Sequence, residues 1–418
     1  MTSKERVKVS FAHKQPDKMA VDFGGFSCSQ ANALVVDELR EYYGLKKEPV
    51  KIIDMSTMTG IMDPDLKDVL GSDVQFLDPK YDTFGHINDN WKEWQYHGKT
   101  VLIPGNCTID DDGSGGYYVY PMGDSTAKAS GHMPAGGYYF DNIMRAPEFD
   151  EDTANPEDNI EECQIISDED LAYYRKVADK YKDSERAMVI SPGYYALGDA
   201  ANIPGPNVKE PKGIRSLEEW YMAPLLYPDY VHEVFAAEAE RAVKSFERIY
   251  DVLGNDIDVM YICGTDFGTQ RGPFVNPDVF AEFYLPYYKK MNDWIHEHTE
   301  WKTLKHSCGG IFPILPLLIE SGFDSVNPVQ CSAAGMDPQK LKDTYGKDIL
   351  FWGGGVDTQK VLPFGTPEEV KDQVKQRCEI FSKDGGYIFN TIHIIQANTP
   401  VANIAAMIDA IKEFNGEK

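Results

Sequence analysis

The chain has 418 residues with a formal net charge of −26, and 42% of its residues are hydrophobic, the composition of a globular protein with a large core. A charge of this sign is repelled by nucleic acid and by anionic membrane surfaces, so we expect neither as a partner. The N-terminus lacks the apolar run of a signal peptide, and no stretch reaches the roughly 18 apolar residues that cross a bilayer, so we expect a cytoplasmic protein.

The first half of the chain shows little regular periodicity. The segment 108–125 (TIDDDGSGGYYVYPMGDS) predicts a hairpin with an acidic turn, and 148–162 (EFDEDTANPEDNIEE) predicts a solvated acidic loop. We interpret the chain as one domain over residues 1–418, with an irregular insertion at about 80–215. A separate small domain in this region is the alternative, because the chain is about half as long again as a bare barrel of alternating strands and helices.

The second half alternates apolar runs with amphipathic segments. The predicted strands lie at 256–268, 301–310, 324–330, 348–355 and 387–395. The predicted helices lie at 274–298, 311–322, 337–346, 366–386 and 399–416. Consecutive strand–helix units with continuous apolar strands predict a parallel sheet covered by helices, and our first choice is an α/β fold of the (β/α)8 TIM barrel type, with insertions over its mouth. A doubly wound open sheet fits the same alternation, but its GxGxxG phosphate turn is missing from the sequence.

Three metal-binding side chains lie near the ends of predicted strands. In KHSCGG, His306 and Cys308 are two positions apart and therefore point to the same face of a strand. His393 occupies the corresponding place in the last predicted strand. Catalytic zinc takes three protein ligands and one exchangeable ligand, and barrels keep their active sites at these strand ends. We predict that His306, Cys308 and His393 bind zinc; a buried cysteine beside a hydrogen-bonded histidine is the structural alternative.

Other polar residues follow predicted strands and are candidates for the same site. Asp266 lies between glycines in ICGTDFGTQRG and is predicted to orient a ligating histidine, act as a general base or anchor a substrate. Gln330 is predicted to take part in catalysis and Asp357 to bind substrate. A turn-capping role is the alternative for Asp266.

Aromatic residues are concentrated in the insertion. In GGYYFDNIMRAP, Tyr138, Tyr139 and Phe140 are predicted to wall an aromatic substrate, and packing beneath a loop is the alternative.

Several motifs resemble one known superfamily. The segments GTDFGTQRGPFVNPDVFAEFYLPYYKKM, LKHSCGGI, ILFWGGGVDTQKVLPFGTPEEV and GGYIFNTIHIIQANTPVANIAAM are similar to the uroporphyrinogen decarboxylase-like superfamily, in its branch of zinc-dependent, corrinoid-linked methyltransferases. The likeness is dense from about residue 255 onward, moderate at 1–45 and thin between. It implies a (β/α)8 barrel that holds zinc through a His-x-Cys pair and a later ligand. It also implies methyl transfer to or from a cobalamin carried by a separate corrinoid protein.

The resemblance assigns the pair to His306 and Cys308. The later ligand is usually a cysteine in relatives that alkylate a thiol, whereas this chain has His393. Zinc with one thiolate and two imidazoles keeps a formal charge of +1 and is a stronger Lewis acid than zinc with two thiolates. We therefore expect an O-demethylase component that moves the methyl group of a small methoxylated substrate to cob(I)alamin.

Alternative functions remain at this point. A methylcobalamin-dependent methyltransferase with a thiol or pterin acceptor is the alternative within the class, and a zinc hydrolase or a non-catalytic ligand-binding barrel are alternatives outside it. True uroporphyrinogen decarboxylases bind their many carboxylates through arginines near the N-terminus. Here the corresponding segment, MAVDFGGFSCSQ, has no basic residue, which argues against decarboxylation. The oligomeric state, monomer or homodimer, is left open.

Overall fold

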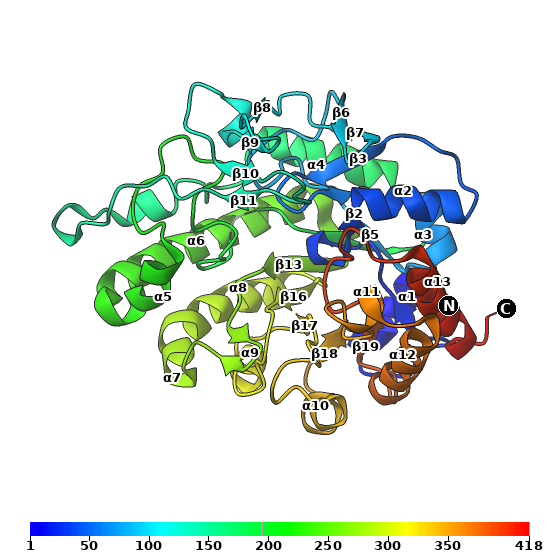
Figure 1. The fold of residues 1–418 in the computed structure, drawn as a ribbon. Helices are drawn as coiled ribbons and strands as arrows, with labels where there is room; N and C mark the ends of the chain where they lie inside the picture. The colour runs from blue at the N-terminus through cyan, green and yellow to red at the C-terminus, as the bar shows by residue number, and fades with distance from the viewer. Residues whose placement is uncertain (194, 418) are drawn as a thin grey trace.

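In this computed structural model, which describes residues 1–193 and 195–417, eight parallel strands form one sheet wound into a barrel (Figure 1). The order of these strands around the barrel is the same as their order along the chain. They are β1 (Ala20–Val21), β5 (Val74–Phe76), β12 (Ala187–Ile190), β13 (Val259–Cys263), β16 (Lys302–His306), β17 (Ser325–Asn327), β18 (Leu350–Trp352) and β19 (Tyr387–Phe389). All their ladders are parallel, so the predicted (β/α)8 barrel is confirmed.

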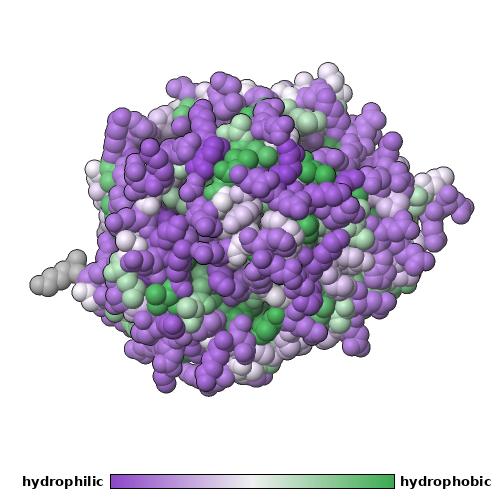
Figure 2. Space-filling model, turned by 180° about the vertical axis from the view of Figure 1, so that it is seen from behind, coloured by the Kyte–Doolittle hydropathy of each residue, from purple (hydrophilic) through white to green (hydrophobic). Residues whose placement is uncertain are grey.

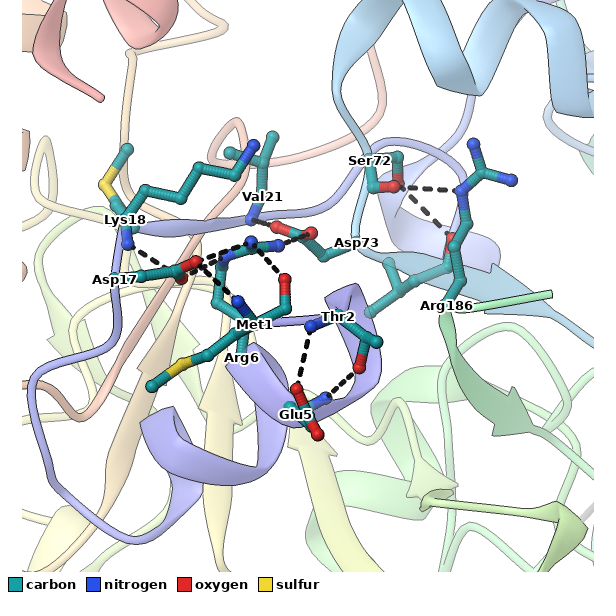
Figure 3. A network of polar contacts seen from close by, with 12 residues as sticks. Met1, Thr2, Glu5, Arg6, Asp17, Lys18, Val21, Ser72, Asp73 and Arg186 are labelled. Atoms are coloured by element: carbon teal, nitrogen blue, oxygen red, sulfur yellow. Dashed lines mark hydrogen bonds and ion pairs between the residues drawn. The ribbon is translucent and has the colours of Figure 1, made fainter. Parts of the chain in front are cut away.

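The seam between the first two strands, β1 and β5, is closed mainly by Asp73. Its N–H donates to the Val21 carbonyl at 2.7 Å, and its Oδ2 accepts the Val21 N–H at 2.9 Å. Arg6 forms an ion pair with the Asp73 carboxylate, and both side chains are at most 5% exposed. Figure 3 shows the Arg6 guanidinium between Asp73 and Asp17, whose Oδ1 accepts from Arg6 Nε at 2.9 Å. The N-terminal helix is thereby fastened to the barrel seam.

Most helices cover the outside of the barrel between its strands, whereas α1 precedes β1 and packs Val7 and Phe11 against the hydrophobic cluster inside the barrel. The helices are α1 (Ser3–Phe11), α2 (Ala33–Tyr42), α3 (Pro64–Leu70), α4 (Asp168–Lys180), α5 (Leu217–Leu226), α6 (Pro228–Leu253), α7 (Pro277–Val279), α8 (Leu285–His298), α9 (Leu315–Glu320), α10 (Pro338–Tyr345), α11 (Val361–Phe364), α12 (Pro367–Phe381) and α13 (Val401–Phe414). A π-helical stretch, Phe280–Tyr284, joins α7 to α8. Predicted helix starts are confirmed where a capping residue precedes proline: Thr366 forms a capping box with Glu369, and Asp337 accepts the Lys340 N–H.

Residues 31–60 and the insertion build two small sheets beside the barrel mouth, at the top of Figure 1. One holds β2 (Ala31–Asn32), β4 (Thr59–Gly60), β3 (Val50–Asp54), β7 (Lys99–Ile103) and β6 (Lys92–Tyr96). The other holds β8 (Ile109–Asp111), β9 (Tyr117–Val119), β10 (Gly131–Met133) and β11 (Asp141–Asn142). The strands β8 and β9 are antiparallel, as expected for a hairpin with an acidic turn. The predicted acidic loop at 148–162 contains only two short 3-10 turns, Glu151–Thr153 and Pro156–Asn159.

The hydrophobic core has two parts that the barrel wall separates. One lies inside the barrel, where Trp352 packs edge-on against Phe26 with 5.7 Å between ring centroids. The larger part lies between the strands, the helices and the insertion. Figure 2 shows that the face opposite the view of Figure 1 is mostly hydrophilic, with small separate hydrophobic patches. No helix in the described ranges combines the length and apolar composition that crossing a membrane requires.

Candidate metal centre

A cavity of about 460 Å³ opens at the carboxyl ends of the barrel strands. The end of β16 and the loops that follow β1, β5, β12, β13 and β19 supply part of its wall. Another part comes from β3 and β4, which precede the insertion, and from residues 79–83, where the insertion begins. Aromatic side chains in the wall are Phe76, Tyr81, Tyr174 and Tyr261. The insertion therefore covers the barrel mouth, as predicted, and narrows the access to the strand ends.

His306 ends β16, and its ring is held by Asn327. The Asn327 amide nitrogen donates to the Trp352 carbonyl at 2.8 Å, so its oxygen Oδ1 faces His306 Nδ1 at 2.7 Å and accepts its hydrogen. The lone pair is then on Nε2, which lies 3.3 Å from Cys308 Sγ and accepts the thiol hydrogen. Burial lowers the pKa of His306 to about 4, so the ring is neutral at pH 7. A neutral imidazole with Nδ1–H fixed by an oxygen is the form in which histidine binds a metal.

Cys308 follows the same strand, and two neighbouring strands hold its loop. Its N–H donates to Asp266 Oδ1 at 2.6 Å, and the Gly309 N–H donates to Gln330 Oε1 at 2.6 Å. Asp266 Oδ1 also lies 4.0 Å from His306 Nε2. Burial raises the pKa of the Cys308 thiol well above its usual value, so the thiol stays protonated until a metal binds. Asp266 and Gln330 thus flank the His-x-Cys pair from β13 and β17.

The first glycine after Cys308 is required by the fold of this loop. Gly309 has φ +87°, and a Cβ added there would lie 2.2 Å from the Gly268 carbonyl carbon. The loop therefore passes directly over the hairpin formed by β14 (Gly268–Thr269) and β15 (Gly272–Pro273), and only glycine allows this approach.

His393 and Cys28 approach His306 from the other side. The His393 ring centroid lies 5.3 Å from that of His306 at an interplanar angle of 74°. Within the described residues, neither ring nitrogen of His393 has a hydrogen-bond partner, and burial lowers its pKa to about 4. Cys28 lies in a short 3-10 turn, Ser27–Ser29, which follows β1. Cys28 is not among the three ligands predicted from the sequence.

Two groups of three donors share His306. Cys28, His306 and His393 form one group, and Asp266, His306 and Cys308 form the other; within each group the donor atoms lie within 4.8 Å of one another. In a zinc tetrahedron with Zn–S of about 2.3 Å and Zn–N of about 2.0 Å, neighbouring S and N atoms are about 3.5 Å apart. The 3.3 Å between Cys308 Sγ and His306 Nε2 agrees with this edge. The Cys28 thiol with the neutral imidazoles of His306 and His393 fits zinc. Among the described residues, neither group holds Cys308 together with His393, so the structure brings each of these two predicted ligands to His306 but not to one another.

The remaining predicted residues lie outside this cavity. Tyr138 stacks on His97 with 4.2 Å between ring centroids, and Phe140 is 3% exposed and packs beneath the insertion. Tyr139 is 49% exposed. Asp357 accepts the Gln359 N–H in the turn before α11. None of these four predicted residues is among the cavity-lining residues. The insertion turns Tyr138, Tyr139 and Phe140 toward its own core or toward solvent, and Asp357 lies in the turn between β18 and α11.

The parallel barrel and the donor cluster at its mouth define the class of protein. Residues 226–414 match the family model described as uroporphyrinogen decarboxylase (URO-D). The matched stretch runs from the end of α5 to the end of α13 and contains His306, Cys308 and His393. This part of the chain therefore carries a URO-D domain, as the sequence motifs predict.

Comparison with solved structures shows how far the fold is shared. A methyltransferase from Methanosarcina mazei matches 99% of this chain and 99% of its own chain at 15% identity, with a TM-score of 0.57. Endo-glycoceramidase II from Rhodococcus sp. has 11% identity over 56% of this chain and 62% of that chain, with a TM-score of 0.31. An endo-beta-mannanase/endo-beta-glucanase from Prevotella bryantii has 9% identity over 67% of this chain and 42% of its own chain, with a TM-score of 0.37. The last two scores are too low to carry an argument. No curated protein matches the sequence.

Proposed function

We propose that this chain is a corrinoid-linked methyltransferase that removes the methyl group of a small methoxylated compound and transfers it to the cob(I)alamin of a corrinoid protein. The observation that carries the proposal is the pair of donor groups that share His306 at the barrel mouth, one with Cys28 and His393 and the other with Asp266 and Cys308. His306 and His393 also line a cavity of small-molecule size. The methyltransferase from Methanosarcina mazei, whose fold extends over the whole chain, supports the reaction class.

His306, Cys308 and His393 are the proposed ligands of zinc. Asn327 keeps the His306 lone pair on Nε2, and Asp266 and Gln330 fix the backbone on each side of the Cys308 thiol. When bound, zinc supplies a Lewis acid for the ether oxygen, and the corrinoid of the partner protein supplies the nucleophile for the methyl carbon. The carbon–oxygen bond breaks with its electron pair on oxygen, so the product is an alkoxide or phenolate that takes a proton from solvent.

We assign substrate binding to the side chains that line the cavity. Phe76, Tyr81, Tyr174 and Tyr261 offer aromatic faces to a planar substrate, in place of the three aromatic residues expected from the sequence. Among the described residues, Asp266 is the only carboxylate in a donor group with His306, and we assign it to positioning, since its Oδ1 already accepts the Cys308 N–H. The covering insertion limits the entry of water at the strand ends.

The test follows methyl transfer directly. The zinc-loaded protein is incubated with chemically reduced cob(I)alamin and a panel of methoxybenzoates and methoxyphenols, and methylcobalamin is measured by absorbance and by chromatography. We expect product with at least one donor, and a loss of at least a hundredfold in rate for His306→Ala and Cys308→Ala. Cys331→Ala is the matched control, because Cys331 is half-buried on the next barrel loop and outside both donor groups.

One observation favours a second candidate, methyl transfer from methylcobalamin to a thiol. Cys28 brings a second sulfur to the site, and zinc with two thiolates is formally neutral, which keeps a bound third thiolate nucleophilic. Consumption of methylcobalamin with a small thiol, together with no product from any methoxylated donor, would replace the first proposal by this one. Hydrolysis of an ester or amide without corrinoid would contradict both.

A further inference from the structure

Cys28 faces the cavity, whereas Cys308 does not line it. The lining residues include two thiols, Cys28 and Cys263, and of the two only Cys28 forms a donor group with His306 and His393. Its sulfur has two weak contacts, 3.7 Å to Ser27 Oγ and 3.9 Å to Tyr261 OH. A thiol with contacts of this length is free to exchange them for a metal bond.

The loop of Cys28 is held firmly from β1 onward. Asp22 Oδ1 accepts the Gly25 N–H at 2.8 Å, and Ser29 Oγ accepts the N–H groups of Gly25 and Phe26 at 2.9 and 3.0 Å. Asp22 Oδ2 in turn accepts from Trp352 Nε1 at 2.8 Å. The position of the Cys28 backbone is therefore set by buried hydrogen bonds.

The same loop is joined to the segment that carries His393. Ala31 forms an isolated parallel bridge with Ile395; the Ile395 N–H donates to the Gln30 carbonyl at 3.2 Å, and the Asn32 N–H donates to the Ile395 carbonyl at 2.9 Å. These backbone contacts lie two to four residues from Cys28 and two residues from His393, so Cys28 and His393 are positioned as one unit against His306.

Neither Cys28 nor His393 makes a short side-chain hydrogen bond within the described residues that a metal bond would have to replace. The His393 ring has no hydrogen-bond partner among the described residues, and it stands edge to face with His306. Cys28, His306 and His393 have donor atoms within 4.8 Å of one another, a set that satisfies the three-ligand requirement of catalytic zinc even without Cys308.

We propose that Cys28 is a thiolate ligand of the same metal as Cys308, so that the site holds zinc through two sulfurs and two imidazole nitrogens until substrate enters. The inference rests on the proposed function, because it concerns the metal that this function requires. On binding, the Cys28 thiol releases its proton to solvent. As the sulfur on the cavity side, Cys28 is the ligand that a substrate oxygen meets first, and its release would leave one thiolate and a formal charge of +1.

The test counts sulfur ligands. Zinc X-ray absorption of the metal-loaded, substrate-free protein should fit two sulfur and two nitrogen neighbours, falling to one sulfur in both Cys28→Ser and Cys308→Ser. Cys331→Ser is the matched control and should keep two. A fit of one sulfur for the unaltered protein, or of two sulfurs for Cys28→Ser, would overturn the inference.

Alkylation provides a second readout that does not depend on spectra. Zinc should slow the labelling of Cys28 by iodoacetamide at least tenfold, measured by mass spectrometry, while labelling of Cys331 stays unchanged. Equal labelling of Cys28 with and without zinc would contradict the inference. If the unaltered protein binds no zinc, the proposed metal site is wrong, and with it the proposed function. If the protein binds zinc through one sulfur and still transfers methyl groups, the proposed role of Cys28 is wrong and the proposed function stands.

Discussion

The hydrogen bond from His306 Nδ1 to Asn327 offers the sharpest test of the metal centre. Asn327 is fully buried, and its amide orientation is fixed by the Trp352 carbonyl. In Asn327→Ala, Nδ1 loses its acceptor at 2.7 Å, and the hydrogen becomes free to move to Nε2, the atom that faces Cys308. Metal binding must then first restore the other tautomer.

The expected loss follows from the role of such oxygen partners. Removing the group that orients a ligating histidine lowers metal affinity by about 10-fold to 100-fold, which is about 1.4 to 2.8 kcal/mol of binding free energy. Asn327→Asp keeps an acceptor for Nδ1 and should recover most of this loss. Zinc affinity is measured at pH 7 by competition with a chromophoric chelator.

The matched control separates this effect from damage to the fold. Asn292 is also fully buried and also donates its amide to one backbone carbonyl, that of Ser321, at 2.7 Å, but it lies on α8 outside the barrel. Asn292→Ala should lose stability without losing zinc affinity. If Asn327→Ala binds zinc within a factor of two of the unaltered protein while remaining folded, the argument from the His306 tautomer is wrong.

Three further outcomes are expected. Burial raises the pKa of Glu238 from its usual 4.5 to about 8, so the folded state retains a proton that the unfolded state releases. The free energy of unfolding therefore falls as pH rises from 5 to 8, by up to about 1.4 kcal/mol per unit, and Glu238→Gln should lack this slope in urea titrations at several pH values. Arg6→Ala leaves the buried Asp73 carboxylate unpaired and should lower the free energy of unfolding by about 3–5 kcal/mol. Arg175→Ala removes an ion pair with Asp256 at the surface and should lower the free energy of unfolding by less than about 1 kcal/mol. Equal losses for Arg6→Ala and Arg175→Ala would show that the buried pair of Arg6 and Asp73 does not stabilise the seam more than a surface pair does. Gln330→Ala removes the acceptor of the Gly309 N–H and should weaken zinc binding severalfold in the chelator assay. An unchanged zinc affinity would mean that Gln330 does not position the Cys308 loop.

The barrel could be predicted because its evidence is local and repeats along the chain. Apolar runs such as the one at β13 are buried at every position, and capped helices such as α12 follow them, so the alternation can be recognised without knowledge of distant contacts. The proximity of His306 and Cys308 follows from the two-residue period of a strand, and the structure confirms it with 3.3 Å between their donor atoms. Asp266 and Gln330 also lie at strand ends, as predicted, and both accept backbone N–H groups of the Cys308 loop.

Tertiary structure alone decided which other residues join the site. β1 has only two residues and no period to recognise, so nothing in the sequence around Cys28 indicated that it lies beside His393, hundreds of residues away. Asn327 orients His306 only because β16 and β17 are neighbours in register. Tyr138, Tyr139 and Phe140 were expected at the substrate, but the path of an irregular insertion depends on what it packs against, and there the contacts lead away from the cavity. The sequence by itself determined the strands, helices and local pairs, because these depend on short-range periodicity. The composition of the site depends on closure of the barrel, which brings the first and last strands together.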